Sequence, residues 1–401
     1  MAGEVKSKAA SGDVPEVSPA QVAAFRLSRH HLQRRVPAAD LARVAGDMAG
    51  AQAQLMSAAQ ISLWARTRGL RLEDIERALW EDRTLVKIWC MRGTVHLVPA
   101  EDHAMFVRGC TKRTDRALDW MARAGIPIGA VDRLLEAVRQ ALDRPRTRKE
   151  LAVHVSESLG IKLHAKGGRG WGGPADAAGF EVGDRTLSVG GILFLACMRG
   201  IACSGPDRGN EATFVRPDVW LPHWRDMPQE EAEEGLLRRY LRAFAPASVQ
   251  DFALWTYMTI GGAREIFERL GGELASLSVG GRTAWALRAD GSALRRAKIE
   301  RPSVRLLPYF DAFLLGHKEK THLVDAAYYK RVYRPQGWLS PVVLVDGRAA
   351  GVWSHERKGA RLSVRVTPFR VMAQATRALV REEADDLGRF LGTAVVSTRF
   401  S

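Results

Sequence analysis

Two glutamines, Gln52 and Gln54, are the residues whose types and spacing could best do chemistry in this sequence. A glutamine amide offers one carbonyl acceptor and two N–H donors, so a pair can hold and orient a water molecule, although neither can act as a strong base. On an extended or irregular segment, side chains two residues apart project to the same side. The small neighbours Gly50, Ala51 and Ala53 let another backbone approach closely. An ordinary surface segment at the mouth of a helix is the other interpretation, because glutamine is a common helix former.

Other catalytic signatures are missing from the sequence. It contains no HExxH, GxxxxGK[ST] or GxSxG motif, which argues against metalloproteases, P-loop nucleotidases and serine hydrolases. Its four cysteines are scattered without a CxxC pair. His30 and His31 are adjacent and so lie on different helix faces, while His317 and His322 stand five residues apart, a poor spacing for a metal. We therefore expect neither a metal site nor a cofactor.

The charge balance favours a polyanionic partner. The chain has 401 residues, with 60 Lys plus Arg against 45 Asp plus Glu, which gives a formal charge of +15. Nucleic acid is the first candidate for the partner and an anionic membrane surface the second. The N-terminal residues hold no apolar signal region, and no apolar stretch approaches the ~18 residues that cross a bilayer. These observations predict a cytoplasmic protein without a membrane segment.

Two basic clusters are candidates for contact with a phosphate backbone. One is the turn of a predicted hairpin, which carries Arg357, Lys358 and Arg361. The other follows a predicted ribbon and contains Arg295, Arg296, Lys298 and Arg301. Either cluster could instead be an ordinary solvated face. Contact with phosphates would make binding strongly dependent on salt.

The elements that must position these residues begin with a disordered tail, predicted for residues 1–20. Apolar periodicity then predicts helices at 21–27, 41–48, 55–64 and 72–80. The β-rich segments 85–89 and 95–98 predict a two-stranded ribbon with a turn at 91–93. Helices followed by a ribbon are typical of a winged helix, so residues 21–130 are predicted as a first winged-helix unit that carries the two glutamines.

The same outline recurs in residues 131–225. Thr147 and Glu150 form a capping box that opens an amphipathic helix within 145–160. A helix at 191–198 and a ribbon formed by 201–203 and 213–215 follow. A Gly-rich segment at 160–184 is predicted as a loop, either a functional or mobile element or a disordered insertion.

A third unit is predicted at 226–300. The acidic segment 226–234 is interpreted as a linker that marks the boundary. Helices at 236–244, 249–258 and 264–270 follow, the second opened by Ser248 and Asp251 as another capping box. A ribbon within 274–287 turns at Gly280 and Gly281.

Residues 301–401 are predicted as a β-rich C-terminal domain. Strands at 305–308, 342–345, 349–354 and 361–366 form a small sheet or barrel, and a closing helix at 369–387 packs on it. The fold class is therefore α+β, with three tandem winged-helix units and a C-terminal β-rich, barrel-like domain.

The chain resembles a known family, the AlkZ-like winged-helix DNA glycosylases, whose motif is Gln-x-Gln near the N-terminus. Gln52 and Gln54 match the two motif glutamines. The other segments that carry the resemblance run in the family's order from about residue 21 to 370. They are RGTVHLV at 92–98, RYL and APA at 239–247, DFALW at 251–255, LLPYFD and LLG at 306–316, and VLVDGR at 343–348.

This resemblance implies winged helices in a C-shaped arrangement and hydrolysis of the N-glycosidic bond of N7-alkylated purines, including bulky natural-product adducts and crosslinks. A sister branch carries Gln-x-Asp, so Gln54 favours the branch that protects producers from their own DNA-alkylating antibiotics. Ala51 replaces a larger apolar residue of many members, and the Gly-rich segment is a further departure. Both bear on the fit of the adduct, and neither affects the reaction class.

The implied chemistry suits neutral amides. An N7-alkylated guanine is already a cationic leaving group, so the enzyme need only orient water and stabilise an oxocarbenium-like sugar. His96 and Asp311 could line the same cleft, with core support and turn capping as their respective alternatives. The sequence thus predicts a monofunctional, cofactor-free and monomeric glycosylase acting on double-stranded DNA with alkylated purines. The alternative is a non-catalytic winged-helix DNA-binding protein, either a regulator or a lesion-binding scaffold.

Overall fold

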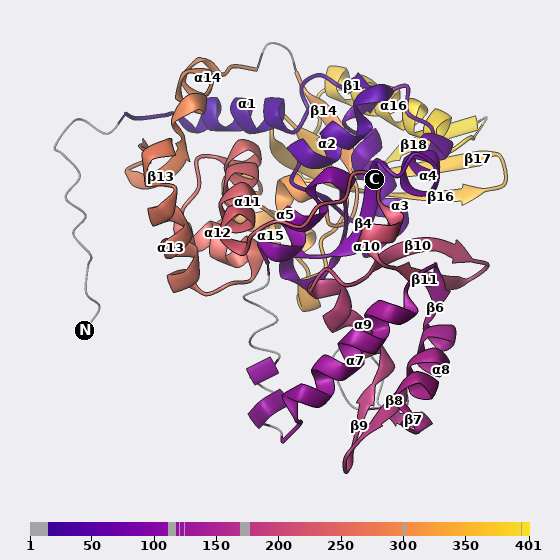
Figure 1. Ribbon diagram of the computed structural model, residues 1–401. Helices are drawn as coiled ribbons and strands as arrows, with labels where there is room; N and C mark the ends of the chain where they lie inside the picture. Colours follow the sequence, from indigo (N-terminus) through magenta and orange to yellow (C-terminus); the bar gives the residue numbers. More distant parts are fainter. Residues whose placement is uncertain are drawn as a thin grey trace.

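The computed structural model describes residues 15–110, 118–119, 121–123, 125–168, 177–299, 302–393 and 395–401. These residues form a mixed α+β fold, as predicted, in which helical and β-rich stretches alternate along the chain (Figure 1). None of the described helices is both long and apolar enough to span a membrane.

The first unit contains the helices and the ribbon that the sequence predicts. The predicted helices are α1 (Pro19–Arg29), α2 (Leu41–Asp47), α3 (Met56–Trp64) and α4 (Leu72–Trp80), followed by β4 (Leu85–Trp89) and β5 (Val95–Pro99). A further helix, α5 (His103–Arg108), comes after the ribbon. Three strands of two residues each were not predicted: β1 (Val36–Pro37), β2 (Ala51–Gln52) and β3 (Thr67–Arg68). β2 pairs antiparallel with β5 in a sheet of order β2-β5-β4. This pairing fixes the first motif glutamine in a strand.

The predicted disordered tail, residues 1–20, is too long. The Val17 amide donates to the Ser278 carbonyl at 2.9 Å, and the Ser278 amide donates to the Pro15 carbonyl at 2.9 Å. Val17 is fully buried, and Ser18 caps α1 through a capping box with Gln21. Residues 15–20 are therefore part of the fold, whereas residues 1–14 lie outside the described residues.

The second unit lies at one end of the molecule (Figure 1). It contains α7 (Ile128–Ala141), β6 (Arg146–Thr147), α8 (Arg148–Leu159), α9 (Val189–Met198), β10 (Cys203–Arg208) and β11 (Glu211–Val215). The predicted Thr147–Glu150 capping box is present at the start of α8. β11 pairs with both β10 and β6, so the ribbon joins the strand that precedes α8.

The segment predicted as a Gly-rich loop is largely β-structure where the structure describes it. β7 (Leu163–Gly168), β8 (Ala177–Val182) and β9 (Arg185–Ser188) form an antiparallel sheet of order β7-β8-β9. Phe180, Val182 and Leu187 are buried and give this sheet an apolar face. The many glycines obscured that alternation. Residues 169–176 lie outside the described residues.

The first helix of the third unit begins earlier than expected, because most of the acidic segment interpreted as a linker is helical. α11 (Gln229–Phe244) includes most of it, and Glu230 and Glu231 occupy its first turn, where carboxylates stabilise the helix dipole. Glu233 is buried and accepts a hydrogen bond from Arg269 at 2.6 Å. The unit continues with α12 (Val249–Thr256), α13 (Ile260–Arg269), β12 (Leu274–Val279), β13 (Arg282–Leu287) and α14 (Gly291–Arg296). The short helix α10 (Pro217–Trp220) precedes it, within the residues predicted as the second unit.

The C-terminal sheet is open, which corrects the expectation of a barrel. Its order is β14-β15-β16-β17-β18, and each edge strand has one partner in the described sheet. The strands are β14 (Val304–Leu307), β15 (Val342–Val345), β16 (Arg348–Lys358), β17 (Arg361–Pro368) and β18 (Val395–Phe400). β18 pairs parallel to β17 and was not predicted. The closing helix α16 (Gln374–Phe390) packs against β14 and β18.

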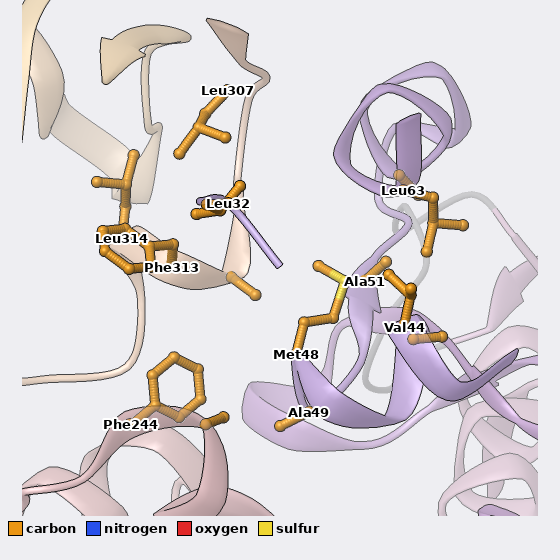
Figure 2. Close-up of a cluster of buried hydrophobic side chains, with 14 of the residues drawn as sticks. Leu32, Val44, Met48, Ala49, Ala51, Leu63, Phe244, Leu307, Phe313 and Leu314 are labelled. Atoms are coloured by element: carbon orange, nitrogen blue, oxygen red, sulfur yellow. The ribbon is translucent and has the colours of Figure 1, made fainter. Parts of the chain in front are cut away.

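One hydrophobic core joins the first unit, the third unit and the C-terminal domain. Figure 2 shows Met48 on the side of the first unit that faces Phe244 of α11 and Phe313 of the C-terminal domain, with Leu63 on the far side of Met48. The second unit has its own core within residues 121–214, and Trp89 packs against both. The units predicted at 21–130, 226–300 and 301–401 therefore share one packed interior.

A buried ion pair also connects the first unit to the C-terminal domain. Arg66 and Asp311 are both fully buried, and their side chains meet through two hydrogen bonds of 2.8 and 2.7 Å. Asp311 also accepts from the Ser62 hydroxyl at 2.5 Å and from the Phe313 amide at 3.0 Å. Such a pair requires a specific geometry, and removing one partner leaves a buried charge unpaired.

Asp311→Asn should lower the free energy of unfolding by about 3–5 kcal/mol, because Arg66 is left buried without its counter-charge. Asp82→Asn is the matched control: its ion pair with Arg77 spans 3.5 Å and both side chains are about half exposed, so its cost should be about 0–1 kcal/mol. Urea denaturation of the two variants measures the difference. Equal losses would show that the buried pair is no more important than a surface pair.

Candidate active site

The site begins at a tight turn between α2 and β2. Ala49 and Gly50 have backbone φ angles of 57° and 94°, and the second value favours glycine. A Cβ on Gly50 would also come within 3.2 Å of both Met91 and Val98. The turn thus needs glycine at residue 50. It delivers the next residues directly into β2, beside β5.

Gln52 is held from behind by Arg92. The Arg92 Nη2 donates to Gln52 Oε1 at 3.0 Å, which fixes the orientation of the amide because only its carbonyl oxygen can accept. Gln52 is 8% exposed. Its Nε2 has no hydrogen-bond partner among the described residues. It is also not one of the fully buried polar atoms without a partner, so it is accessible. The free N–H donors of Gln52 therefore face the accessible side.

His96 completes the contact behind Gln52. It is the cross-strand partner of Gln52 in the β2–β5 ladder, and its Nδ1 donates to the Thr94 carbonyl at 3.0 Å. Its Nε2 must then be the acceptor for Arg92 Nη2, 3.1 Å away. Burial and, second, the positive charge of Arg92 hold the pKa of His96 well below its usual value. His96 is thus neutral at physiological pH.

Arg92 is anchored on a third element. Its Nη1 donates to the Trp255 carbonyl of α12 at 3.2 Å. Its own backbone adopts φ 57°, ψ 8°, a left-handed conformation that costs a non-glycine residue about 1–3 kcal/mol. Burial lowers the pKa of Arg92 to about 10, so the guanidinium stays protonated. Strain and desolvation are both tolerated here, and this places Arg92 among the functional candidates.

Gln54 lies in a different environment from Gln52. It is exposed, and its side chain makes no hydrogen bond to any described residue. Ala53 between them is buried, and its amide donates to the Val95 carbonyl at 2.7 Å. One glutamine is therefore fixed from behind and the other is free to bind a ligand or water. This asymmetry was not predicted.

The structure brings His96 next to Gln52 and gives Asp311 a different role. All four hydrogen bonds to the Asp311 carboxylate come from Arg66, Ser62 and Phe313. It caps a short 3-10 helix and binds Arg66, so the turn-capping alternative describes it. The sequence reading missed Arg92. The available signal was its place beside Gly93 in the predicted turn at 91–93.

The first basic cluster lies at the tip of the β16–β17 hairpin, which extends away from the body of the molecule (Figure 1). Arg357, Lys358 and Arg361 are all exposed. Lys358 pairs with Glu356 at 3.0 Å, and Arg357 Nε donates to the Gly359 carbonyl at 3.3 Å. The hairpin thus presents two arginines and a partly neutralised lysine.

The second basic cluster divides in two. Arg296 and Lys298 line a recess beside α1, whereas Arg295 does not line it and its backbone carbonyl accepts from Gln21. Arg301 lies outside the described residues. In the described parts of the chain, no three His, Cys, Asp or Glu side chains come close enough together to hold a metal ion.

The comparisons with known proteins agree with each other. The family model for "DNA glycosylase AlkZ-like" matches residues 45–390. A Streptomyces sahachiroi protein, "Interstrand DNA cross-link repair glycosylase", is 31% identical over 389 residues, which cover 94% of this chain and 98% of the relative. The solved structure of Streptomyces sahachiroi DNA glycosylase AlkZ matches with a TM-score of 0.79 and 28% identity, covering 96% of this chain and all of that one.

The matched residues 45–390 span the glutamine turn, Arg92 and α12. The chain belongs to the AlkZ-like DNA glycosylase family and is an enzyme that hydrolyses N-glycosyl bonds in DNA.

Proposed function

We propose that this DNA glycosylase removes N7-alkylguanine from double-stranded DNA, with Gln52 and Gln54 positioning the water that attacks the sugar. The observation that carries the proposal is the pairing of a fixed amide with a free one. Gln52 is held by Arg92 with its N–H donors outward, and Gln54 is exposed two residues later. No acid or metal is required by this chemistry.

The proposed substrate class follows from the neutral character of the two glutamine amides, which cannot protonate a leaving base. Alkylation at N7 gives guanine a positive charge, so the base can leave without being protonated. The relative from Streptomyces sahachiroi is named for repair of interstrand crosslinks, which supports bulky natural-product adducts or crosslinks as substrates. We propose that the enzyme protects its host from such an agent.

In the proposed step, the C1′–N9 bond breaks and its electron pair neutralises the purine. The water oxygen forms a bond to C1′, and one water proton passes to solvent. Gln54 Oε1 accepts a hydrogen bond from the water, while Gln52 Nε2 donates one to it. Because amides are weak bases, the rate enhancement comes from positioning and electrostatics.

The wider parts of the proposal concern DNA binding. The order α7, β6, α8, α9, β10, β11, with β6 paired to β11, supports the winged-helix interpretation of the second unit. We extend that interpretation to the first and third units and to a C-shaped arrangement around duplex DNA. The charge of +15 supports this partner. A monomer acting in the cytoplasm without a cofactor completes the proposal.

Gln52→Ala and Gln54→Ala should each lower kcat for release of an N7-alkylguanine by about 100-fold or more, because the water loses one of its two contacts. Base release from a duplex with a single bulky N7 adduct is measured as alkali-sensitive strand breaks. Gln60→Ala, on the adjacent helix α3, is the control and should retain wild-type activity.

Two results would contradict this prediction. Full activity in both variants would remove the glutamines from the mechanism, and efficient release of uracil, a neutral base, would show that the lesion's own charge is not needed. Tight binding of the adduct by wild type without any base release would instead support the alternative, a non-catalytic DNA-binding protein.

Arg92→Met should lower kcat by about 100-fold while leaving duplex affinity unchanged, because Gln52 loses the donor that orients it. Arg92→Lys should lose less activity than Arg92→Met, since a lysine keeps the charge. It should still be less active than wild type, because it lacks the planar fork that reaches both Gln52 and Trp255.

The pH profile separates orientation from a general loss of structure. In wild type, His96 stays neutral, so kcat should be flat from pH 6 to 8. Without the Arg92 charge the pKa of His96 rises, and the protonated ring can donate to Gln52. Burial still holds the pKa of His96 below its ordinary value, so Arg92→Met should gain activity only at the acidic end of the profile, and Arg92→Met/His96→Asn should not. An identical loss at every pH would contradict the orienting role.

Arg357→Ala/Lys358→Ala should flatten the dependence of log K on log salt by up to about 1.8, since each phosphate contact contributes about 0.9. Glu356→Gln is the control, because it frees Lys358 from its ion pair and should strengthen binding to duplex DNA. Fluorescence anisotropy at several salt concentrations measures both variants. An unchanged slope in the double variant would exclude the hairpin from the interface.

A further inference from the structure

A basic recess lies between α1, the turn that follows it, α2, α11 and α14. Its volume is about 680 Å³. Among the residues that the structure describes, six cationic residues line it and one carboxylate, that of Asp47, does so. The cationic residues are Arg29, Arg34, Arg43, Arg242, Arg296 and Lys298. Four of these were not candidates from the sequence, because they come from three separate segments.

Three of the six cations have no ion-pair partner within 4 Å among the described residues. Arg29 pairs with Asp290, and Arg43 pairs with Asp40 at 2.8 Å and with Asp47 at 3.4 Å. No such pair is formed by Arg242, Arg296 or Lys298, and all three are exposed. Three exposed positive charges on one concave surface, with no ion-pair partner among the described residues, favour the binding of an anion from outside.

The walls of the recess are held by specific contacts. His31 Nε2 lies 2.7 Å from Asp47 Oδ2, which joins the turn after α1 to α2. Gln33 Nε2 donates to the Ala24 carbonyl at 2.9 Å and to the Lys298 carbonyl at 3.4 Å, which joins the segment after α14 to α1. The cations are thus carried on connected elements and can meet a ligand with little rearrangement.

We propose that this recess binds the phosphodiester backbone of duplex DNA next to the reaction site, an inference that rests on the proposed function. Arginine forks match phosphate oxygens in pairs, and five of the six cations are arginines. Asp47, on its wall, is five residues before Gln52, so at ~3.3–3.6 Å per residue the two lie within about 17 Å. At ~3.4 Å per base pair, this wall of the recess lies within about five base pairs' length of Gln52, so we expect the phosphates held at this wall within about that distance of the lesion.

The first test is the salt dependence of binding to an undamaged duplex. Arg242→Ala/Arg296→Ala/Lys298→Ala should flatten the slope of log K against log salt by up to about 2.7. The matched control, Arg68→Ala/Lys162→Ala/Arg264→Ala, removes the same charge from exposed residues on β3, before β7 and on α13. Its slope should stay near that of wild type. Equal flattening in the two triple variants, or none in the first, would overturn the proposal.

The second test locates the contact. A duplex with one stable abasic-site analogue is treated to ethylate single phosphates, and phosphates whose ethylation blocks binding are mapped for wild type and the recess variant. Wild type should show blocking phosphates within about five base pairs of the analogue that the variant lacks. Identical maps, or differences only farther away, would contradict the placement.

Neither test requires base release. If the salt slopes change as expected but the wild type releases no alkylated base, the recess stands and the proposed activity fails. If base is released and the slopes do not change, the activity stands and the recess fails.

Discussion

A partly buried guanidinium must find acceptors, and the acceptors that Arg92 finds determine the geometry of the site. They are the Gln52 side chain, the His96 ring and the Trp255 carbonyl, which come from β2, β5 and α12. Taking the charge out of water is costly, so the fold gains only if all three elements stand in register. The same requirement fixes the Gln52 amide with its nitrogen outward. The need to pair the Arg92 guanidinium therefore positions β2, the His96 ring and the candidate catalytic amide of Gln52 together.

The protein uses buried arginines in this way more than once. Arg66 binds Asp311 across the shared core. Arg26 of α1 donates to three successive backbone carbonyls at 244–246, at distances of 2.7–3.2 Å. Each guanidinium satisfies several acceptors at once, which a lysine could not do in the same geometry. These arginines are thus structural, and the charge available to DNA is concentrated at fewer places, such as the recess beside α1.

The sequence was informative wherever structure is determined by near neighbours. The capping boxes at Thr147 and Ser248 open the helices they predicted, and the β12–β13 ribbon turns at its two glycines. Prediction from the sequence failed where contacts between distant segments determine the structure. The two-residue strand β2 exists only because β5 pairs with it, β18 is held by β17, and Asp311 meets Arg66 across 245 positions. Local propensity carries no signal for such contacts. The glutamine pair was found, but its asymmetry depends on Arg92 and was not.

That asymmetry also explains why the two motif positions differ in what they tolerate. At position 52 the oxygen faces Arg92 and the nitrogen faces outward. A carboxylate there would bind the guanidinium at least as well but would lose the outward N–H donor, so an amide is required. Position 54 has no partner in the described residues, and in the proposed mechanism it accepts a hydrogen bond from water. Either an amide or a carboxylate can do that. The Gln-x-Gln and Gln-x-Asp branches that this chain resembles vary only at the second position, which is the one that this geometry leaves free.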